Sequence, residues 1–198
     1  MMVVGITGGI GSGKSTVTNY FKELENVVTY IADEEAKKLM NTSITLINAI
    51  KKEFGDQAYK NNILDSAYIA NLVFKNKEQL KRLNAIVHPE VHRHFSKFIE
   101  ANKGAIILYE NAILFEIGSD RFCDIIITVY TNKKERISRV MNRDKSSEKE
   151  VLNRMANQWE DEKKIWLSNY IITNNSLKLL VPQIMNIHNI LTEKLKYF

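Results

Sequence analysis

Short apolar runs alternate along this chain with longer segments in which apolar residues recur at the spacing of a helix. The apolar runs are rich in β-branched residues and predict buried strands at residues 3–7, 27–31, 105–109, 124–130 and 170–173. The amphipathic segments predict helices at residues 14–24, 36–54 with a break near 41–43, 65–74, 76–101, 133–143, 146–167 and 177–196. Because strands alternate with helices throughout, the pattern predicts an α/β fold with a parallel central sheet covered by helices on both faces.

Capping residues and one proline predict where several helices begin or stop. Asp33 and Asp65 are each placed to cap a helix at its N-terminus, and Ser147 followed by Glu150 has the spacing of a capping box. Pro89 disfavours helical backbone angles in the residue before it, so the helix at 76–101 is expected to be interrupted there.

The spacing of the strands predicts how a single domain is organised. A core is expected at about residues 1–33, 104–138 and 169–198. The helical stretches at about 34–103 and 139–168 are longer than simple crossovers need. We therefore expect the first to be a substrate-binding cap and the second a mobile lid.

The composition narrows the class of protein. Of the 198 residues, 44% are hydrophobic and 26% are charged, which is typical of a soluble globular chain. The net charge of +5 admits a nucleic-acid surface or a polyanionic small substrate, and the absence of a dominant basic block favours the second. A lone Cys123 excludes an intrachain disulfide, and no apolar run has the length of a signal peptide or membrane span. A cytoplasmic monomer with no membrane or nucleic-acid partner is expected.

One motif carries specific chemistry. The sequence GGIGSGKST at residues 8–16 follows an apolar run and leads into a helical segment, which is the setting of a phosphate-binding P-loop. Glycines let successive amides turn toward one anion, and the helix that follows adds its positive end. The predicted nucleotide ligands are Gly9, Gly11, Ser12, Gly13, Lys14, Ser15 and Thr16. Lys14 would contact the β- and γ-phosphates, and Ser15 would hold Mg²⁺.

Acidic residues near the ends of predicted strands are the next candidates, because ligands bind beyond the carboxyl ends of strands in an open sheet. Asp33 follows the second strand, and it could reach the γ-phosphate if that strand neighbours the P-loop strand. The alternative is a plain capping carboxylate. Glu110 could be the acid that supports the metal, but Glu116 competes for this role and either could simply face solvent.

A row of arginines follows the fourth strand. Arg136, Arg139 and Arg143 share one helix face, and Arg154 lies on the next helix. Such a row suits phosphate binding, but it could equally be a solvated face paired with Glu135 or Asp144. The functional interpretation is favoured for Arg143, open for Arg139 and less favoured for Arg136. His88, judged by its neighbours alone, is a structural residue at a helix break.

Several stretches together resemble one family, the dephospho-coenzyme A kinases. They are residues 5–16 (GITGGIGSGKST), 32–33 (AD), 83–89 (LNAIVHP), 114–116 (LFE), 139–144 (RVMNRD), 154–158 (RMANQ) and 171–174 (IITN). Their order and spacing follow the family over the whole chain, and the segment at 83–89 is more diagnostic than the P-loop.

The resemblance implies a P-loop NTPase-type three-layer fold and an Mg²⁺-dependent reaction of ATP with dephospho-CoA. The γ-phosphate would pass to the ribose 3′-hydroxyl, giving CoA and ADP, with Asp33 as the base. Lys14 and Arg143 would also be catalytic. His88 and Glu110 would contribute, with Asp33, to the acceptor site.

The resemblance also implies roles for two residues on the ATP side, and it shows where the chain departs from the family. Arg139 would belong to a lid over ATP, and Asn174 would lie near the adenine. The departures are Ile31, Ser66, Ala112 and Ser168-Asn169, where the family usually has other residues. They concern the acceptor side more than the ATP side.

Three other functions stay open at this point. The first is a nucleoside or nucleotide kinase with a different acceptor. The second is a P-loop regulatory switch, although the chain has neither a D-x-x-G motif after the P-loop nor an N-K-x-D motif. The third is nucleic-acid binding through the basic surface, which would be strongly salt-dependent.

Overall fold

A computed structural model describes residues 1–74 and 76–197 and divides the chain into two compact units. The first unit comprises Met1–Ile31 and Asn102–Phe198, and the second comprises Ala32–Ala101. Residues 139–168 therefore belong to the first unit, together with the sheet. Within the described residues, no helix combines the length and the apolar character needed to cross a membrane. The cap and lid roles of the two helical stretches stay predictions.

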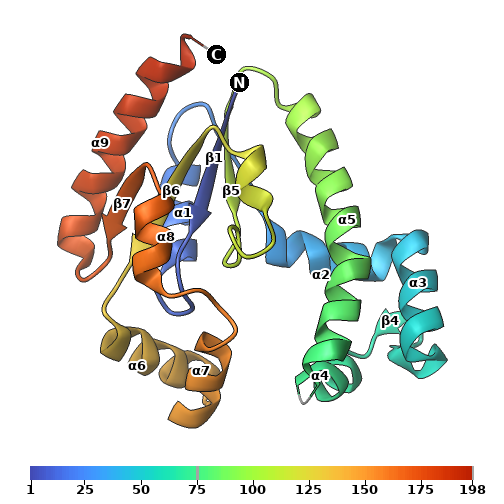
Figure 1. The fold of residues 1–198 in the computed structure, drawn as a ribbon. Coiled ribbons are helices and arrows are strands. Elements are labelled where there is room, and N and C mark those ends of the chain that lie inside the picture. Colours follow the sequence, from blue (N-terminus) through green and yellow to red (C-terminus); the bar gives the residue numbers. More distant parts are fainter. Residues whose placement is uncertain (75, 198) are drawn as a thin grey trace. The chain divides into compact units, whose positions relative to one another are not determined.

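The first unit is built on a five-stranded sheet in which neighbouring strands pair in parallel (Figure 1). Its strands are β1 (Met2–Thr7), β2 (Val27–Ile31), β5 (Ile106–Glu110), β6 (Ile125–Tyr130) and β7 (Tyr170–Thr173), in the order β2-β5-β1-β6-β7. The strands expected from the apolar runs are therefore confirmed, as is the α/β class with a parallel central sheet.

The strand order corrects one expectation about the site. We considered that β2 might neighbour the P-loop strand β1, but β5 lies between them, and Ile6 of β1 is in register with Glu110 of β5. The acid that the sheet places beside the P-loop is consequently Glu110. Hydrophobic patterning identifies each strand, but it contains no information about which strands pair.

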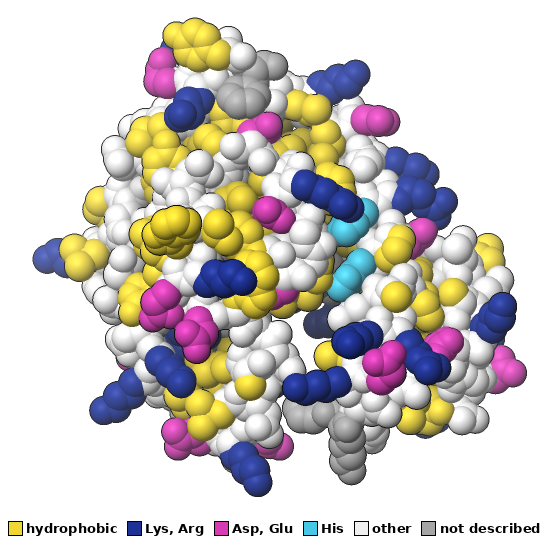
Figure 2. All heavy atoms as spheres, in the orientation of Figure 1, with side chains coloured by type: hydrophobic (Ala, Val, Ile, Leu, Met, Phe, Trp, Pro, Cys, Tyr) yellow, Lys and Arg dark blue, Asp and Glu magenta, His cyan; other side chains and the backbone are white. Residues whose placement is uncertain are grey.

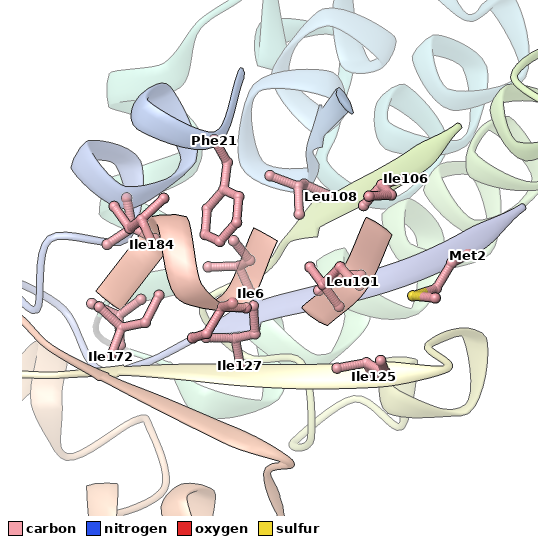
Figure 3. Packing of buried hydrophobic residues seen from close by; sticks show 14 of the residues in the cluster. Met2, Ile6, Phe21, Ile106, Leu108, Ile125, Ile127, Ile172, Ile184 and Leu191 are labelled. Atoms are coloured by element: carbon pink, nitrogen blue, oxygen red, sulfur yellow. The ribbon is translucent and has the colours of Figure 1, made fainter. Parts of the chain in front are cut away.

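One face of the sheet packs against two helices, α1 (Lys14–Lys22) and α9 (Leu177–Leu195). Figure 3 shows Phe21 of α1 and Ile184 and Leu191 of α9 beside the strand residues. The fully buried members of this core are Met2, Val4, Ile6, Val17, Phe21, Ile106, Leu108, Ile127, Val129, Ile172, Leu180 and Leu191. Burial of this many large side chains is the main contribution to the stability of the unit.

The opposite face of the sheet contacts α8 (Asp161–Leu167) and the loop after β5. Alternation along β6 turns Thr128 away from the core just described, and its hydroxyl lies 2.6 Å from that of Ser168 at the end of α8. Gly5 of β1 leaves room on this face for Leu114 and Cys123. Burial raises the pKa of the Cys123 thiol to about 12, so the thiol is not reactive.

Three further elements of the first unit lie after β5: η2 (Ser119–Phe122), α6 (Lys133–Asp144) and α7 (Glu148–Met155). The capping box of Ser147 and Glu150 is confirmed at the start of α7. The single helix expected at 146–167 is wrong, since α7 ends before a turn that precedes α8. In the segment between the two helices, the N–H of Trp159 donates to Glu116 at 2.8 Å.

The second unit is helical, with one small hairpin. Its elements are α2 (Ala32–Thr42), α3 (Ile44–Phe54), η1 (Asp56–Ala58), β3 (Tyr59–Lys60), β4 (Ile63–Leu64), α4 (Ser66–Phe74) and α5 (Lys77–Ala101). The break near 41–43 is confirmed at Ser43, and the N-terminal cap of Asp65 is confirmed by a 3.0 Å bond from the Tyr68 N–H. Asp33 lies inside the first turn of α2, so its expected capping position is wrong. The hairpin was not predicted.

Pro89 does not interrupt α5, which runs continuously from Lys77 to Ala101. Val87, Val91 and Phe95 form a buried stripe at helical spacing on both sides of the proline. Burial of this stripe offsets the missing backbone hydrogen bond, so the proline preference is overridden by packing.

Candidate functional site

The glycines of residues 8–16 give the loop a curled backbone. Gly8, Gly11 and Gly13 have φ of 144°, 80° and 91°, which other residues rarely adopt. Gly13 directly precedes α1, and no side chain caps that helix. The N-terminal amides of α1 are consequently available to an anion. A Cβ at Gly13 would collide with the side chain of Asn174, so a glycine is required there for space as well as for conformation.

Lys14 and Ser15 lie at the base of this loop. The Lys14 ammonium donates to the carbonyl of Gly8 at 3.0 Å, which holds the charge over the loop. The Ser15 hydroxyl donates to Oε1 of Glu110 at 3.1 Å. Glu110 is only 6% exposed, and its Oε2 is buried without a hydrogen-bond partner among the described residues. A buried carboxylate oxygen that lacks a partner normally has a water or a cation beside it.

This pair of oxygen ligands fits Mg²⁺. A hydroxyl and a carboxylate are hard ligands, and Mg²⁺ is usually held by one or two protein groups together with waters and substrate phosphates. The described residues contain no cluster of three or more His, Cys, Asp or Glu side chains able to hold a metal, so an all-protein cage is not formed there.

A pocket of about 270 Å³ opens beside the loop. It is lined by Gly11, Gly13, Lys14, Ser15, Thr16, Arg139, Val140 and Arg143. The structure therefore brings together most of the residues that the sequence assigned to ATP. Lys14, Arg139 and Arg143 give the pocket a positive lining, as a polyphosphate requires.

The two arginines of the pocket have carboxylate partners. Arg139 donates to Glu135 at 3.1 Å and to the backbone carbonyl of Asn174 at 3.0 Å. Arg143 donates to Asp144 at 2.6 Å, and Arg154 also donates to Asp144 at 2.6 Å. These two guanidinium groups hold the pKa of Asp144 far below its usual value. The sequence left open a pairing of these arginines with Glu135 and Asp144, and both ion pairs are present. Figure 2 shows charges of both signs on the surface of the molecule.

Asn174 supports the loop from behind. Its side-chain amide donates to the carbonyl of Ser12 at 2.9 Å, and its own carbonyl accepts from Thr131 at 2.9 Å. Thr131 also donates to the Ser12 carbonyl at 3.1 Å. These bonds fix the segment just before Lys14. The contact of Asn174 with adenine stays a prediction.

Sequence reasoning assigned no contact with the loop to Gln158, and it gave Arg136 the least weight of the three arginines of α6. Gln158 accepts a hydrogen bond from the Ile10 N–H, and Arg136 donates to the Ile10 carbonyl, each at 2.8 Å. Arg136 is only 5% exposed, so it is not part of a solvated face. The signal was present in α6, because Arg136 precedes the apolar Val140 by one helical turn and shares its inward face.

Glu116 has a structural role. Its Oε1 accepts from the Lys164 ammonium and from the Trp159 N–H, both at 2.8 Å. The Lys164 ammonium, which is fully buried, also donates to the Ala112 carbonyl at 2.7 Å. Burial lowers the pKa of Lys164 against the opposing effect of Glu116. The ion pair ties α8 to the loop after β5, and of the two acids it is Glu110 that accepts from Ser15 of the phosphate loop. Which acid supports the metal stays a prediction.

Lys164→Met should lower the free energy of unfolding by about 3 kcal/mol, because it leaves Glu116 charged and buried without its cation. Urea denaturation measures this loss. Lys178→Met, at an exposed position of α9, is the matched control and should be near neutral. Adding Glu116→Gln to Lys164→Met should recover part of the loss, since the amide still accepts from Trp159. If Lys164→Met and the control Lys178→Met had equal free energies of unfolding, this account of the ion pair would be contradicted.

The acceptor-side candidates Asp33 and His88 lie in the second unit. His88 lies on α5, and its ring stacks on that of His92 with centroids 6.5 Å apart. Burial lowers the pKa of His88, as does His92, while Asp33 opposes them. The exposed Asp33 carboxylate of α2 thus acts electrostatically on the His88 imidazole of α5.

Comparisons with known sequences agree with these features. A family model described as dephospho-CoA kinase matches residues 2–179. A dephospho-CoA kinase from Bacteroides fragilis (strain YCH46) is 33% identical over 195 residues, which cover 98% of this chain and 95% of that relative. One from Chlorobaculum tepidum is 38% identical over 182 residues, which cover 88% and 86% of the two chains.

Solved structures show the same architecture. The crystal structure of TT1252 from Thermus thermophilus has a TM-score of 0.83 at 30% identity and covers 97% of both chains. A dephospho-CoA kinase from Campylobacter jejuni has a TM-score of 0.73 at 24% identity, covering 97% of this chain and 98% of that one. Shikimate kinase from Acinetobacter baumannii has a TM-score of 0.53 at 16% identity, covering 98% and 95%. The last two show likeness of fold alone, and they confirm the P-loop kinase-type fold.

Proposed function

Because this chain belongs to the dephospho-CoA kinase family, a family of phosphotransferases in coenzyme A synthesis, we propose a specific reaction for it. The γ-phosphate of ATP is transferred to the ribose 3′-hydroxyl of dephospho-CoA, and the products are CoA and ADP. The observation that carries the proposal is the curled glycine loop with Lys14 over it and Ser15 bonded to Glu110. This arrangement accepts a triphosphate and a divalent cation together.

On the donor side, the chain positions and neutralises phosphate charge. The loop amides and the N-terminus of α1 hold the phosphates, and Lys14 exchanges the carbonyl of Gly8 for phosphate oxygens. Arg139 and Arg143 neutralise the charge that spreads over the transferred group. Ser15 and Glu110 would hold Mg²⁺, whose positive charge would reduce the repulsion of the phosphates toward the incoming hydroxyl.

On the acceptor side, Asp33 takes the proton of the 3′-hydroxyl. The hydroxyl oxygen forms the new bond to the γ-phosphorus while the bond from phosphorus to the β,γ-bridging oxygen breaks, and ADP leaves with that electron pair. Burial keeps His88 neutral, so its ring can form a hydrogen bond with dephospho-CoA without adding charge beside Asp33.

The product assay tests the reaction directly. The protein is incubated with Mg-ATP and dephospho-CoA, and CoA is detected by its mass. Nucleoside monophosphates and shikimate, offered in parallel, test whether a different acceptor is used. Preferential phosphorylation of one of these, with no CoA formed, would assign the chain a different acceptor. Nucleotide-dependent partner binding without any phosphorylated product would favour a regulatory switch.

Glu110→Gln tests the metal position. The amide oxygen still accepts from Ser15, but the negative charge that attracts the cation is lost. We expect the Mg²⁺ concentration for half-maximal activity to rise about tenfold, as for the loss of one charge-assisted contact. Glu100→Gln, at an exposed position of α5, is the control and should leave the Mg²⁺ dependence unchanged. An unchanged Mg²⁺ dependence in Glu110→Gln would remove Glu110 from the metal site.

A further inference from the structure

One residue of the phosphate loop, Ile10, is held through both its backbone N–H and its backbone carbonyl by side chains from distant elements. The Ile10 N–H donates to Oε1 of Gln158 at 2.8 Å, and the Ile10 carbonyl accepts from Nε of Arg136 at 2.8 Å. Arg136 lies on α6, and Gln158 lies in the turn between α7 and α8.

Arg136 is itself fixed in place. Its guanidinium forms an ion pair with Asp161 at the start of α8, and both side chains are nearly buried. A Cβ at Gly9 would occupy the position of this guanidinium, so the loop backbone packs directly against it. A buried ion pair adds little net stability, but its geometry is demanding, so it fixes position well.

Gln158 is held by the residue that follows it. The Trp159 N–H donates to Glu116, and its ring stacks on Phe115 with centroids 6.3 Å apart and planes 3° apart. The Lys163 ammonium lies 3.2 Å from the centroid of the same ring. The turn is therefore anchored on the loop after β5, and it presents the Gln158 oxygen to Ile10.

The direction of these bonds matters for phosphate binding. A phosphate loop works because amide N–H groups converge on the anion, and a carbonyl oxygen turned into the same cup would repel it. Arg136 does not line the pocket that contains Lys14. It lines a separate cavity of about 510 Å³ on the side of α7, together with Gln158, Trp159 and Asp161. The Ile10 carbonyl is thus bonded to a group outside the Lys14 pocket.

We propose that Gln158, Arg136 and Asp161 form an Ile10 clamp, a set of positioning residues that hold the loop in its phosphate-binding shape before ATP arrives. The inference rests on the proposed function only in taking ATP as the ligand of the loop. None of the three residues lines the pocket that contains Lys14. They keep the loop ordered in the absence of ATP. The entropy cost of ordering the loop on binding, which would weaken the affinity for ATP, is therefore avoided.

Gln158→Met is the decisive variant, since it keeps the length of the side chain and removes the acceptor. Binding of Mg-ATP, measured by calorimetry without an acceptor substrate, should weaken about five- to tenfold, as for the loss of one buried hydrogen bond. The KM for dephospho-CoA should stay unchanged. Asn157→Met is the matched control, because the neighbouring amide is exposed and bonds only to the Asn153 carbonyl in the described contacts.

Arg136→Lys and Asp161→Asn provide independent tests of the same clamp. The lysine keeps the charge beside Asp161 but lacks the Nε donor to Ile10, so ATP binding should again weaken with an unchanged KM for dephospho-CoA. Unchanged ATP binding in Gln158→Met would overturn the proposal. A fall in thermal stability together with equal increases in the dissociation constant for Mg-ATP and the KM for dephospho-CoA would also overturn it, because that result indicates a general structural role. Because the calorimetry contains no acceptor, failure of CoA synthesis by the wild type would not alter this comparison.

Discussion

Asp33→Asn should lower kcat for CoA formation by roughly a hundredfold to ten-thousandfold, the usual contribution of a positioned general base. Asparagine has the same shape as aspartate but cannot take the proton of the attacking hydroxyl. The affinity for Mg-ATP should stay within about twofold, because the phosphate loop is built from other residues. Steady-state turnover measures the first effect, and calorimetric titration with Mg-ATP measures the second.

Glu34→Gln is the matched control for this prediction. It removes a carboxylate from the adjacent exposed position of α2 and should leave kcat nearly unchanged. If Asp33→Asn kept most of its turnover, the base would have to be another group. Loss of ATP affinity together with turnover would instead place Asp33 on the donor side, with the metal.

The phosphate loop was predictable from the sequence because its chemistry is local. The left-handed conformations of Gly11 and Gly13 and the start of α1 at Lys14 follow from a short motif between a strand and a helix, whereas the bond from Ser15 to an acid does not. Identification of Glu110 as that acid needed one further fact, the pairing of β1 with β5. Strand pairing joins residues far apart in the chain, and it is not encoded in the local pattern of apolar residues.

The missed contacts share a physical cause. The Trp159 N–H donates to Glu116, 43 residues away in the sequence. Arg136 is charged, and charged residues are seldom buried, so the sequence alone does not indicate its burial. Only the folded arrangement supplies the partner, Asp161, that makes its burial possible. Local propensity thus identified the elements, while the polar contacts between distant elements required the structure.

Lys14→Met should damage both ATP binding and turnover, with kcat/KM for ATP lower by about a hundredfold. The methionine keeps an unbranched side chain of similar length but removes the charge that now lies 3.0 Å from the Gly8 carbonyl. Hydrogen bonds to charged groups contribute about 1.5–3 kcal/mol each, and Lys14 is positioned for both the β- and γ-phosphates. Initial-rate kinetics over a range of ATP concentrations measures the effect.

Lys22→Met, in the last turn of the same helix, separates this effect from a general loss of positive charge. Lys22 is exposed and faces away from the loop end of α1, so its removal should change kcat/KM for ATP by less than about twofold. Equal losses of kcat/KM in Lys14→Met and Lys22→Met would mean that the reaction with ATP depends on the overall positive potential of the protein. A loss confined to Lys14→Met, present at both low and high salt, requires direct contact with phosphate, because a nearby desolvated charge is screened far less than an exposed one.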